Sequence, residues 1–180
     1  MVLVIYGLER CLIKMKYQEM KTQTIVKIAL YAAVVATVTM FTSVQFAAGG
    51  YFNLGDVVVM LLAALIPFRH AAMAVAVGSV TADLLLGAVL YSPFTGLIKV
   101  LMALVVYLMR ATLNKKYYFV PFLLASLLMV GLYGLVDAFI LGGYTFFASV
   151  AANAIQGLLG FVITAFVYPF SMKLRDFLEE

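Results

Sequence analysis

Residues 94–109 read FTGLIKVLMALVVYLM, an apolar run that contains one charged residue, Lys99. Apolar runs of this kind cross bilayers as helices, and an ionisable residue inside one indicates a functional site. Hydrophobic residues make up 66% of the 180 residues and charged residues 11%. Soluble domains carry about 25% charged residues. The chain therefore has too little polar surface for a water-soluble globule, and we predict an all-α membrane protein.

Five further apolar segments accompany this run, which predicts a six-transmembrane-helix bundle in a single domain, residues 21–180. In order, the segments cover approximately residues 24–46, 54–68, 71–90, 94–109, 118–141 and 145–170. A straight crossing needs about 20 residues, so the second and fourth should rest against other helices or have non-helical flanks. Residues 1–20 lack the features of a signal peptide. We interpret them as a dispensable extension, a start-site artefact or an interfacial helix.

The basic residues alternate with the segments. The chain has twelve lysines and arginines, and all except Lys99 fall on one side of the predicted bundle. These are Arg10, Lys14, Lys16, Lys21, Lys27, Arg69, Arg110, Lys115, Lys116, Lys173 and Arg175. Cytoplasmic loops collect positive charge, so both termini are predicted to face the cytoplasm, with the bundle in a plasma membrane of prokaryotic type. The net charge of +4 comes mainly from these loops and does not indicate nucleic-acid binding.

Polar side chains gather in the opposite, outer half of the bundle. Asp83 and Lys99 lie about 12 and 9 Å inside the outer ends of their segments, at about 1.5 Å per residue. Opposite charges at similar depth on neighbouring helices can form an ion pair. Tyr51, Tyr91 and Tyr144 stand at the rim, where they could stack on a planar ligand. The predicted substrate-binding residues are Asn53, Asp56, Asp83, Tyr91, Lys99, Asp137, Tyr144, Asn153 and Gln156.

Each of these residues also has a purely structural interpretation. An Asp83–Lys99 pair could fix helix register, and Asp56 could be a first-turn acid favoured by the helix dipole. Asn153 and Gln156 could form interhelical hydrogen bonds. Asp137 could meet headgroups and water, and the tyrosines could belong to an interfacial aromatic belt. The clustering of all these residues favours a binding site that opens to the outside.

Small residues form one face of the first segment. Ala29, Ala32, Ala33 and Ala36 are spaced by three and four, which lets another helix approach closely. The partner could be another protein or a helix of the same bundle.

The chain contains no motif for nucleotide hydrolysis or for the common hydrolytic mechanisms. Cys11 and His70 are the only cysteine and the only histidine, so an internal disulfide and a cysteine- or histidine-rich metal site are excluded. We therefore expect no cofactor or metal in this chain and no enzymatic activity. A pocket without an energy source works passively or depends on a partner.

Three motifs follow one another along the chain: GYFNLGD at residues 50–56, GSVTADLLLG at 78–87 and YSPFTGLIK at 91–99. Their order and spacing resemble the S components of energy-coupling factor (ECF) vitamin transporters, especially the riboflavin-type family, over about residues 22–175. The resemblance implies that the chain captures a vitamin outside and docks through Ala29–Ala36 on a T component. Two ABC ATPases would then use ATP to topple the S component and release the vitamin inside.

The charges of the site bear on the identity of the ligand. Three carboxylates accompany one lysine, whereas anionic vitamins such as biotin, folate or pantothenate would favour a surplus of cationic donors. We expect a neutral or protonatable heterocycle, with pyridoxine or hydroxymethylpyrimidine favoured and riboflavin next. The main alternative is a stand-alone secondary transporter in which Asp83 and Asp137 relay protons or sodium. An intramembrane enzyme and an assembly subunit are further alternatives.

Overall fold

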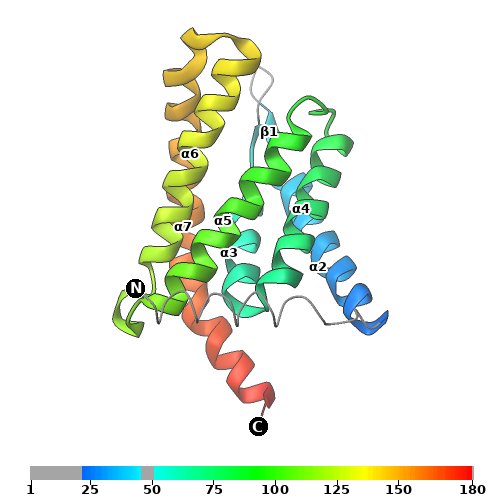
Figure 1. The fold of residues 1–180 in the computed structure, drawn as a ribbon, viewed down its shortest axis with the longest axis vertical. Helices are drawn as coiled ribbons and strands as arrows, with labels where there is room; N and C mark the ends of the chain where they lie inside the picture. Colours follow the sequence, from blue (N-terminus) through cyan, green and yellow to red (C-terminus); the bar gives the residue numbers. More distant parts are fainter. Residues whose placement is uncertain (1–21, 46–50, 180) are drawn as a thin grey trace, which may run out of the picture.

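The computed structural model describes residues 22–45 and 51–179 and confirms a helical architecture (Figure 1). The predicted extension, residues 1–20, lies outside the described residues. The α-helices of the described part are α2 (Thr22–Phe41), α3 (Gly55–Leu65), α4 (Phe68–Leu85), α5 (Ser92–Thr112), α6 (Val120–Leu141) and α7 (Phe146–Glu179). Short 3₁₀ turns, η1 (Lys115–Tyr117) and η2 (Gly143–Thr145), precede α6 and α7.

Four of these helices, α2, α5, α6 and α7, are long and apolar enough to cross a membrane, and α3 is a shorter apolar helix. Helix α5 begins before its predicted start because Pro93 sits in its first turn, where proline is well tolerated, and it continues three residues beyond its predicted end. Helix α3 ends at Leu65 because Pro67 follows and holds Ile66 in an extended conformation. At 1.5 Å per residue, α3 is about 16 Å long and cannot cross a bilayer core alone.

A two-stranded hairpin, which we did not predict, leads into α3. Strand β1 (Val44–Gln45) pairs antiparallel with β2 (Tyr51–Phe52). The sequence predicts the end of the first helix where β1 lies and a loop where β2 lies. Helix α2 ends at Phe41, where the hydroxyls of Thr42 and Ser43 donate to the carbonyls of Val38 and Thr39 at 2.7 and 2.6 Å. This non-helical flank supplies the length that α3 lacks, as we expected for the second segment.

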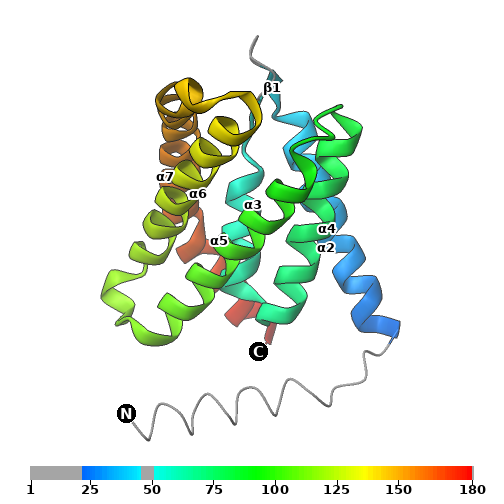
Figure 2. The same ribbon diagram turned by 45° about the horizontal axis from the view of Figure 1, so that its top comes forward.

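Helix α3 is the centre of the bundle and contacts α2, α4, α5 and α7. In Figures 1 and 2, α6 and α7 run side by side on one flank and α2 and α4 on the other, with α3 and α5 between them. The core contains fully buried Met60 of α3, Met102 of α5, and Phe122 and Met129 of α6. The side chains of α3 are therefore shielded from lipid on most sides.

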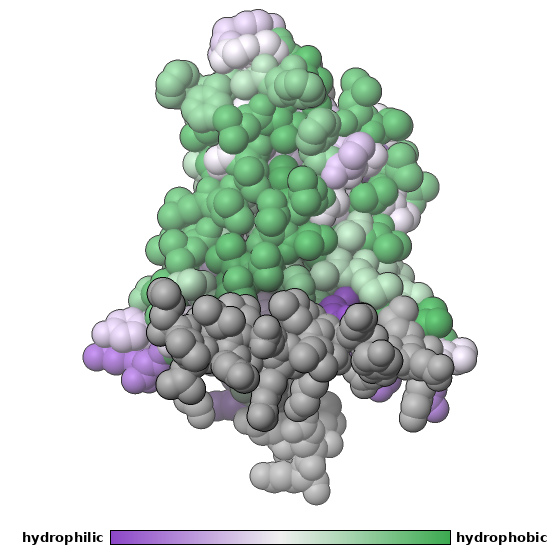
Figure 3. Space-filling view, viewed as in Figure 1, coloured by the Kyte–Doolittle hydropathy of each residue, from purple (hydrophilic) through white to green (hydrophobic). Residues whose placement is uncertain are grey.

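Both ends of the described chain lie at the same end of the bundle. The start of α2, the end of α7 and the α3–α4 and α5–α6 connections lie at the bottom of Figure 1, and the hairpin and the α6–α7 connection lie at the top. Figure 3 shows a broad apolar surface over the middle of the molecule and hydrophilic residues toward the lower end. Arg69, Arg110, Lys116 and Lys173 all belong to segments at this lower end. The arrangement agrees with the charge pattern of the sequence.

Candidate functional site

A buried ion pair joins α3 to α5. Lys99 of α5 is 4% exposed and its Nζ pairs with Oδ1 of Asp56, which lies in the first turn of α3. We predicted a pair between Lys99 and Asp83, and the charge of Asp83 does act on Lys99. The structure adds Asp56 as the ion-pair partner, because the start of α3 lies at the depth of Lys99. Three charged side chains thus meet inside the bundle.

Gln156 of α7 is the second side chain that binds the Asp56 carboxylate. Its Nε2 donates to Asp56 Oδ2 at 2.7 Å, and its Oε1 accepts a hydrogen bond from the backbone N–H of Asn53 at 3.0 Å. The Asn53 side chain in turn accepts a hydrogen bond from the backbone N–H of Gly55 at 2.8 Å. Asn53, Asp56 and Gln156 are all buried. Their hydrogen bonds join the start of α3 to α7, whose residue Gln156 is 100 positions from Asp56 in the sequence.

Helix α4 contributes a second carboxylate and a hydroxyl. Asp83 is 0% exposed, and Ser79, one turn earlier on the same face, is also buried. Among the described residues, the Ser79 hydroxyl has no hydrogen-bond partner. Buried polar groups are normally hydrogen-bonded, so the Ser79 hydroxyl is an exception among the polar side chains of this region. We call Asn53, Asp56, Ser79, Asp83, Lys99 and Gln156 the polar cluster.

Between the polar cluster and the outer end of the bundle, two tyrosine hydroxyls form hydrogen bonds across the α5–α6 interface, one donated from the α5 side and one from α6. Tyr91, just before α5, donates to Asp137 Oδ1 of α6 at 2.7 Å. One turn deeper, Tyr133 of α6 donates to Thr95 Oγ1 of α5 at 3.2 Å, and its ring centroid lies 5.2 Å from Lys99 Nζ. Positions 91, 95 and 99 on α5, and 133 and 137 on α6, are spaced by four, so each set lies on one helix face. Together they form a polar ladder from the outer end of α5 down to the polar cluster.

The outer end of the ladder has a defined protonation state. Partial burial and the hydrogen bond and charge of Asp137 raise the pKa of the Tyr91 hydroxyl above its ordinary value. Tyr91 therefore remains a protonated donor to Asp137 through the physiological pH range.

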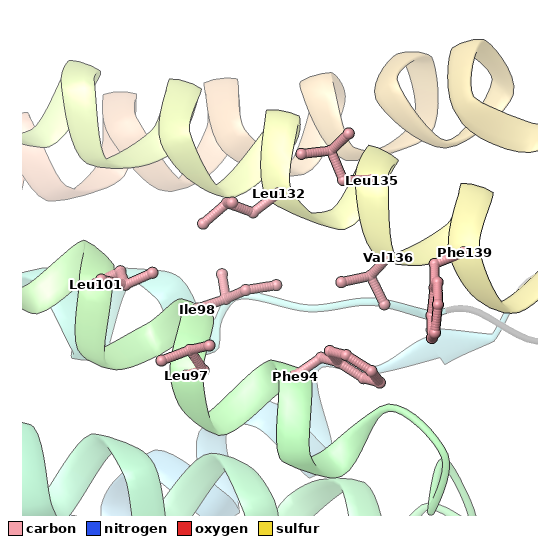
Figure 4. A pocket seen from close by; sticks show the side chains of 8 residues that line it. All are labelled: Phe94, Leu97, Ile98, Leu101, Leu132, Leu135, Val136 and Phe139. Atoms are coloured by element: carbon pink, nitrogen blue, oxygen red, sulfur yellow. The ribbon is translucent and has the colours of Figure 1, made fainter. Parts of the chain in front are cut away.

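The other side of the α5–α6 seam is apolar. Figure 4 shows a groove of about 200 Å³ lined by four residues from each helix. The lining residues are Phe94, Leu97, Ile98, Leu101, Leu132, Leu135, Val136 and Phe139. Leu97 and Leu135 are more than half exposed, so the groove faces the surroundings of the bundle rather than its interior. The side chains that line the groove are all apolar, whereas the polar side chains of the two helices lie on the ladder side.

The predicted site residues divide into two groups. Asn53, Asp56, Asp83, Lys99 and Gln156 converge in the polar cluster, and Tyr91 and Asp137 pair above it. Asn153 instead donates to the carbonyl and hydroxyl of Ser149 on its own helix, at 3.0 and 3.1 Å. Tyr144 lies in η2 and is 86% exposed. Among the residues that the structure describes, neither Asn153 nor Tyr144 forms a hydrogen bond with the polar cluster.

The four alanines of α2 also divide. Ala32 and Ala36 are buried, and Gly78 of α4 packs closely against α2 beside them. Ala29 and Ala33 are exposed on α2. Two of the four alanines thus serve packing inside the bundle, and the other two lie on its surface.

We did not single out Thr95, Tyr133 or Ser79 from the sequence. Thr95 and Tyr133 each lie four residues before a predicted site residue, Lys99 and Asp137 respectively, and Ser79 lies four before Asp83. This helical spacing could have identified them. Among the described residues, no three His, Cys, Asp or Glu side chains are grouped as a metal site.

Comparison with known families identifies the class of protein. The family model described as "ECF-type riboflavin transporter, S component" matches residues 19–173. The chain belongs to this family. A comparison with individual curated proteins gives no significant match. As a riboflavin-transporter-type S component, the chain is a membrane-embedded, multi-pass transporter subunit for a vitamin-type substrate, not an enzyme.

Proposed function

We propose that this S component binds its vitamin, or a vitamin precursor, at the polar cluster and delivers it from the outside to the cytoplasm. The observation that carries the proposal is the buried Lys99–Asp56–Gln156 network, which joins α3, α5 and α7. A buried ion pair is weak support for stability, because desolvation offsets much of the attraction between the charges. Ionisable groups inside a membrane bundle generally mark a substrate or ion pathway. The network therefore fits a recognition site.

The charges of the polar cluster suggest the class of ligand. Asp56 and Asp83 are two carboxylates against the single ammonium of Lys99. A ligand that donates hydrogen bonds, or carries a proton on a ring nitrogen, suits this balance better than an anion does. Pyridoxine or hydroxymethylpyrimidine remain the favoured ligands, with riboflavin next. Tyr91, Asp137, Tyr144 and Asn153 would line the approach from outside.

Transport would depend on partner subunits. We propose that exposed Ala29 and Ala33 contribute to docking on a T component, which works with two ABC ATPases. These ATPases would use ATP, and this chain would hold neither a cofactor nor an ATPase site of its own. Six crossings of the plasma membrane, with both termini cytoplasmic, would place the lower end of Figure 1 inside the cell.

Binding by variants of the purified protein tests the site. Isothermal titration with pyridoxine, hydroxymethylpyrimidine and riboflavin should give binding of at least one of them to the wild type. Asp83→Asn and Lys99→Ala should each weaken that binding at least tenfold. Lys116→Ala, an exposed lysine at the opposite end of the bundle, is the matched control and should bind as the wild type does. Unchanged affinity in both cluster variants would remove these residues from the site.

Transport assays separate the proposal from a stand-alone carrier. Vesicles that contain this chain alone should bind the vitamin without accumulating it, with or without a proton or sodium gradient. Addition of the T component, the ATPases and ATP should start accumulation. Gradient-driven uptake by the chain alone would favour the ion-coupled alternative.

A further inference from the structure

Two of the tyrosines that we selected as stacking partners, Tyr91 and Tyr144, do not lie beside the polar cluster. Tyr144 is largely exposed in η2, and Tyr91 is bonded to Asp137 two turns above Lys99. Tyr133, by contrast, lies directly beside Lys99 of the polar cluster. Its ring face lies 5.2 Å from Lys99 Nζ, and its hydroxyl is held by Thr95 at 3.2 Å.

The geometry at Lys99 limits where a ligand can lie. A group that accepts a hydrogen bond from Lys99 lies within about 3 Å of Nζ. A planar ligand held there can place its ring within about 4.5–7 Å of the Tyr133 ring, the separation at which aromatic rings interact favourably. The bond to Thr95 restricts rotation of the tyrosine, so the ring is already oriented before a ligand arrives.

We propose that Tyr133 is a specificity-determining residue of the binding site, which stacks on a planar aromatic heterocycle held by Lys99 and Asp56. The inference rests on the proposed function and adds a requirement for aromaticity in the ligand. The ring of Tyr133 supplies the recognition, and its hydroxyl supplies orientation through Thr95. A non-aromatic solute of similar polarity lacks this contact and binds less tightly.

Three variants separate the ring from the hydroxyl. The probe is whichever of pyridoxine, hydroxymethylpyrimidine or riboflavin binds the wild type, titrated calorimetrically and by absorbance. Tyr133→Leu should weaken binding at least tenfold and abolish the loss of ligand absorbance that stacking produces. Tyr133→Phe and Thr95→Val remove the same hydrogen bond but keep the ring, so each should weaken binding no more than threefold and keep the absorbance change.

Tyr168→Leu is the matched control for removal of a buried aromatic ring. Tyr168 lies in α7, toward the end of the helix that we propose to be cytoplasmic, and is buried against Phe122. Loss of its ring should lower the melting temperature without changing affinity for the ligand.

Wild-type affinity in a folded Tyr133→Leu variant, or equal losses in Tyr133→Phe and Tyr133→Leu, would overturn the inference. If Lys99→Ala weakens binding while Tyr133→Leu does not, the proposed function stands and the role of Tyr133 fails. If Lys99→Ala has no effect, or the wild type binds none of the probes, the proposed function fails, and the inference fails with it.

Discussion

At the scale of single residues, the start of α3 depends on a glycine. A Cβ at Gly55 would lie 2.1 Å from Thr39 Oγ1 and 2.8 Å from Asn53 Oδ1. Thr39 is buried in α2, and the Asn53 side chain accepts the hydrogen bond of the Gly55 N–H. The close approach of α2 to α3 therefore also fixes the position of Asn53, whose backbone N–H bonds to Gln156, and of the first turn of α3, which contains Asp56.

We predict that Gly55→Ala destabilises the protein by about 1–3 kcal/mol, the usual cost of overpacking. Thermal unfolding in detergent would measure this as a lower melting temperature, together with weaker vitamin binding. Gly131→Ala in α6 is the control, because nothing lies within 4 Å of a Cβ built there. That change should be neutral or slightly stabilising. Equal melting temperatures for the two variants would contradict the packing argument.

Tyr91 gives a prediction about pH. Because the pKa of the folded-state hydroxyl is raised, deprotonation favours the unfolded state. The stability that Tyr91 contributes is fully present below its ordinary pKa of about 10 and is lost as pH rises beyond it toward the folded pKa. Thermal unfolding of the wild type and Tyr91→Phe should therefore differ most below pH 10 and converge above it. A difference that grows with alkaline pH would contradict this assignment.

At the scale of elements, the sequence predicted the existence of the helices better than their ends. Apolar length located each helix because a bilayer-spanning segment must be long and uncharged. The end of α2 was missed because hydroxyls of Thr42 and Ser43 bond back to the helix and turn the chain into the hairpin. Such competition between local hydrogen bonds leaves little trace in hydropathy.

The contact between α2 and α4 depends on Gly78. A Cβ there would lie 2.5 Å from the backbone carbonyl oxygen of Ala32 and 2.8 Å from Val35 Cβ. Gly78→Ala must therefore move α2 as a whole, and we expect a loss of about 1–3 kcal/mol in thermal unfolding. At Gly96 the nearest atom is the end of the Val80 side chain, at 2.9 Å, which can move. Gly96→Ala should consequently lower the melting temperature less than Gly78→Ala does, and the reverse order would contradict the assigned contact.

At the scale of the whole molecule, charge and depth predicted where polar groups gather but not how they pair. Asp83 and Lys99 could be matched by depth on neighbouring helices. Asp56 could not, because its position depends on a hairpin and a short helix that hydropathy does not resolve. Gln156 likewise reaches Asp56 across 100 residues of sequence. Asn153 instead donates to the carbonyl of Ser149, one turn earlier on its own helix, a local bond that depth along the helix does not predict.

The orientation of the bundle gives a prediction for labelling. In a Cys11→Ser background, cysteines at Lys116 and Lys173 should react with impermeant maleimide only when the cytoplasmic face is accessible. A cysteine at exposed Tyr144 should react from outside in intact cells. Labelling of Lys116→Cys from outside, or of all three from one side, would contradict six crossings with cytoplasmic termini.

Helix α7 has 34 residues, so at 1.5 Å per residue it is about 51 Å long, well beyond the roughly 30 Å of a hydrocarbon core. In Figure 1 it projects below the rest of the bundle. Lys173 lies in the last two turns of α7, and drawing its ammonium into hydrocarbon is costly. In the toppling that the family resemblance implies for transport, we expect this end to stay in water, so that the outer ends of the helices travel farthest.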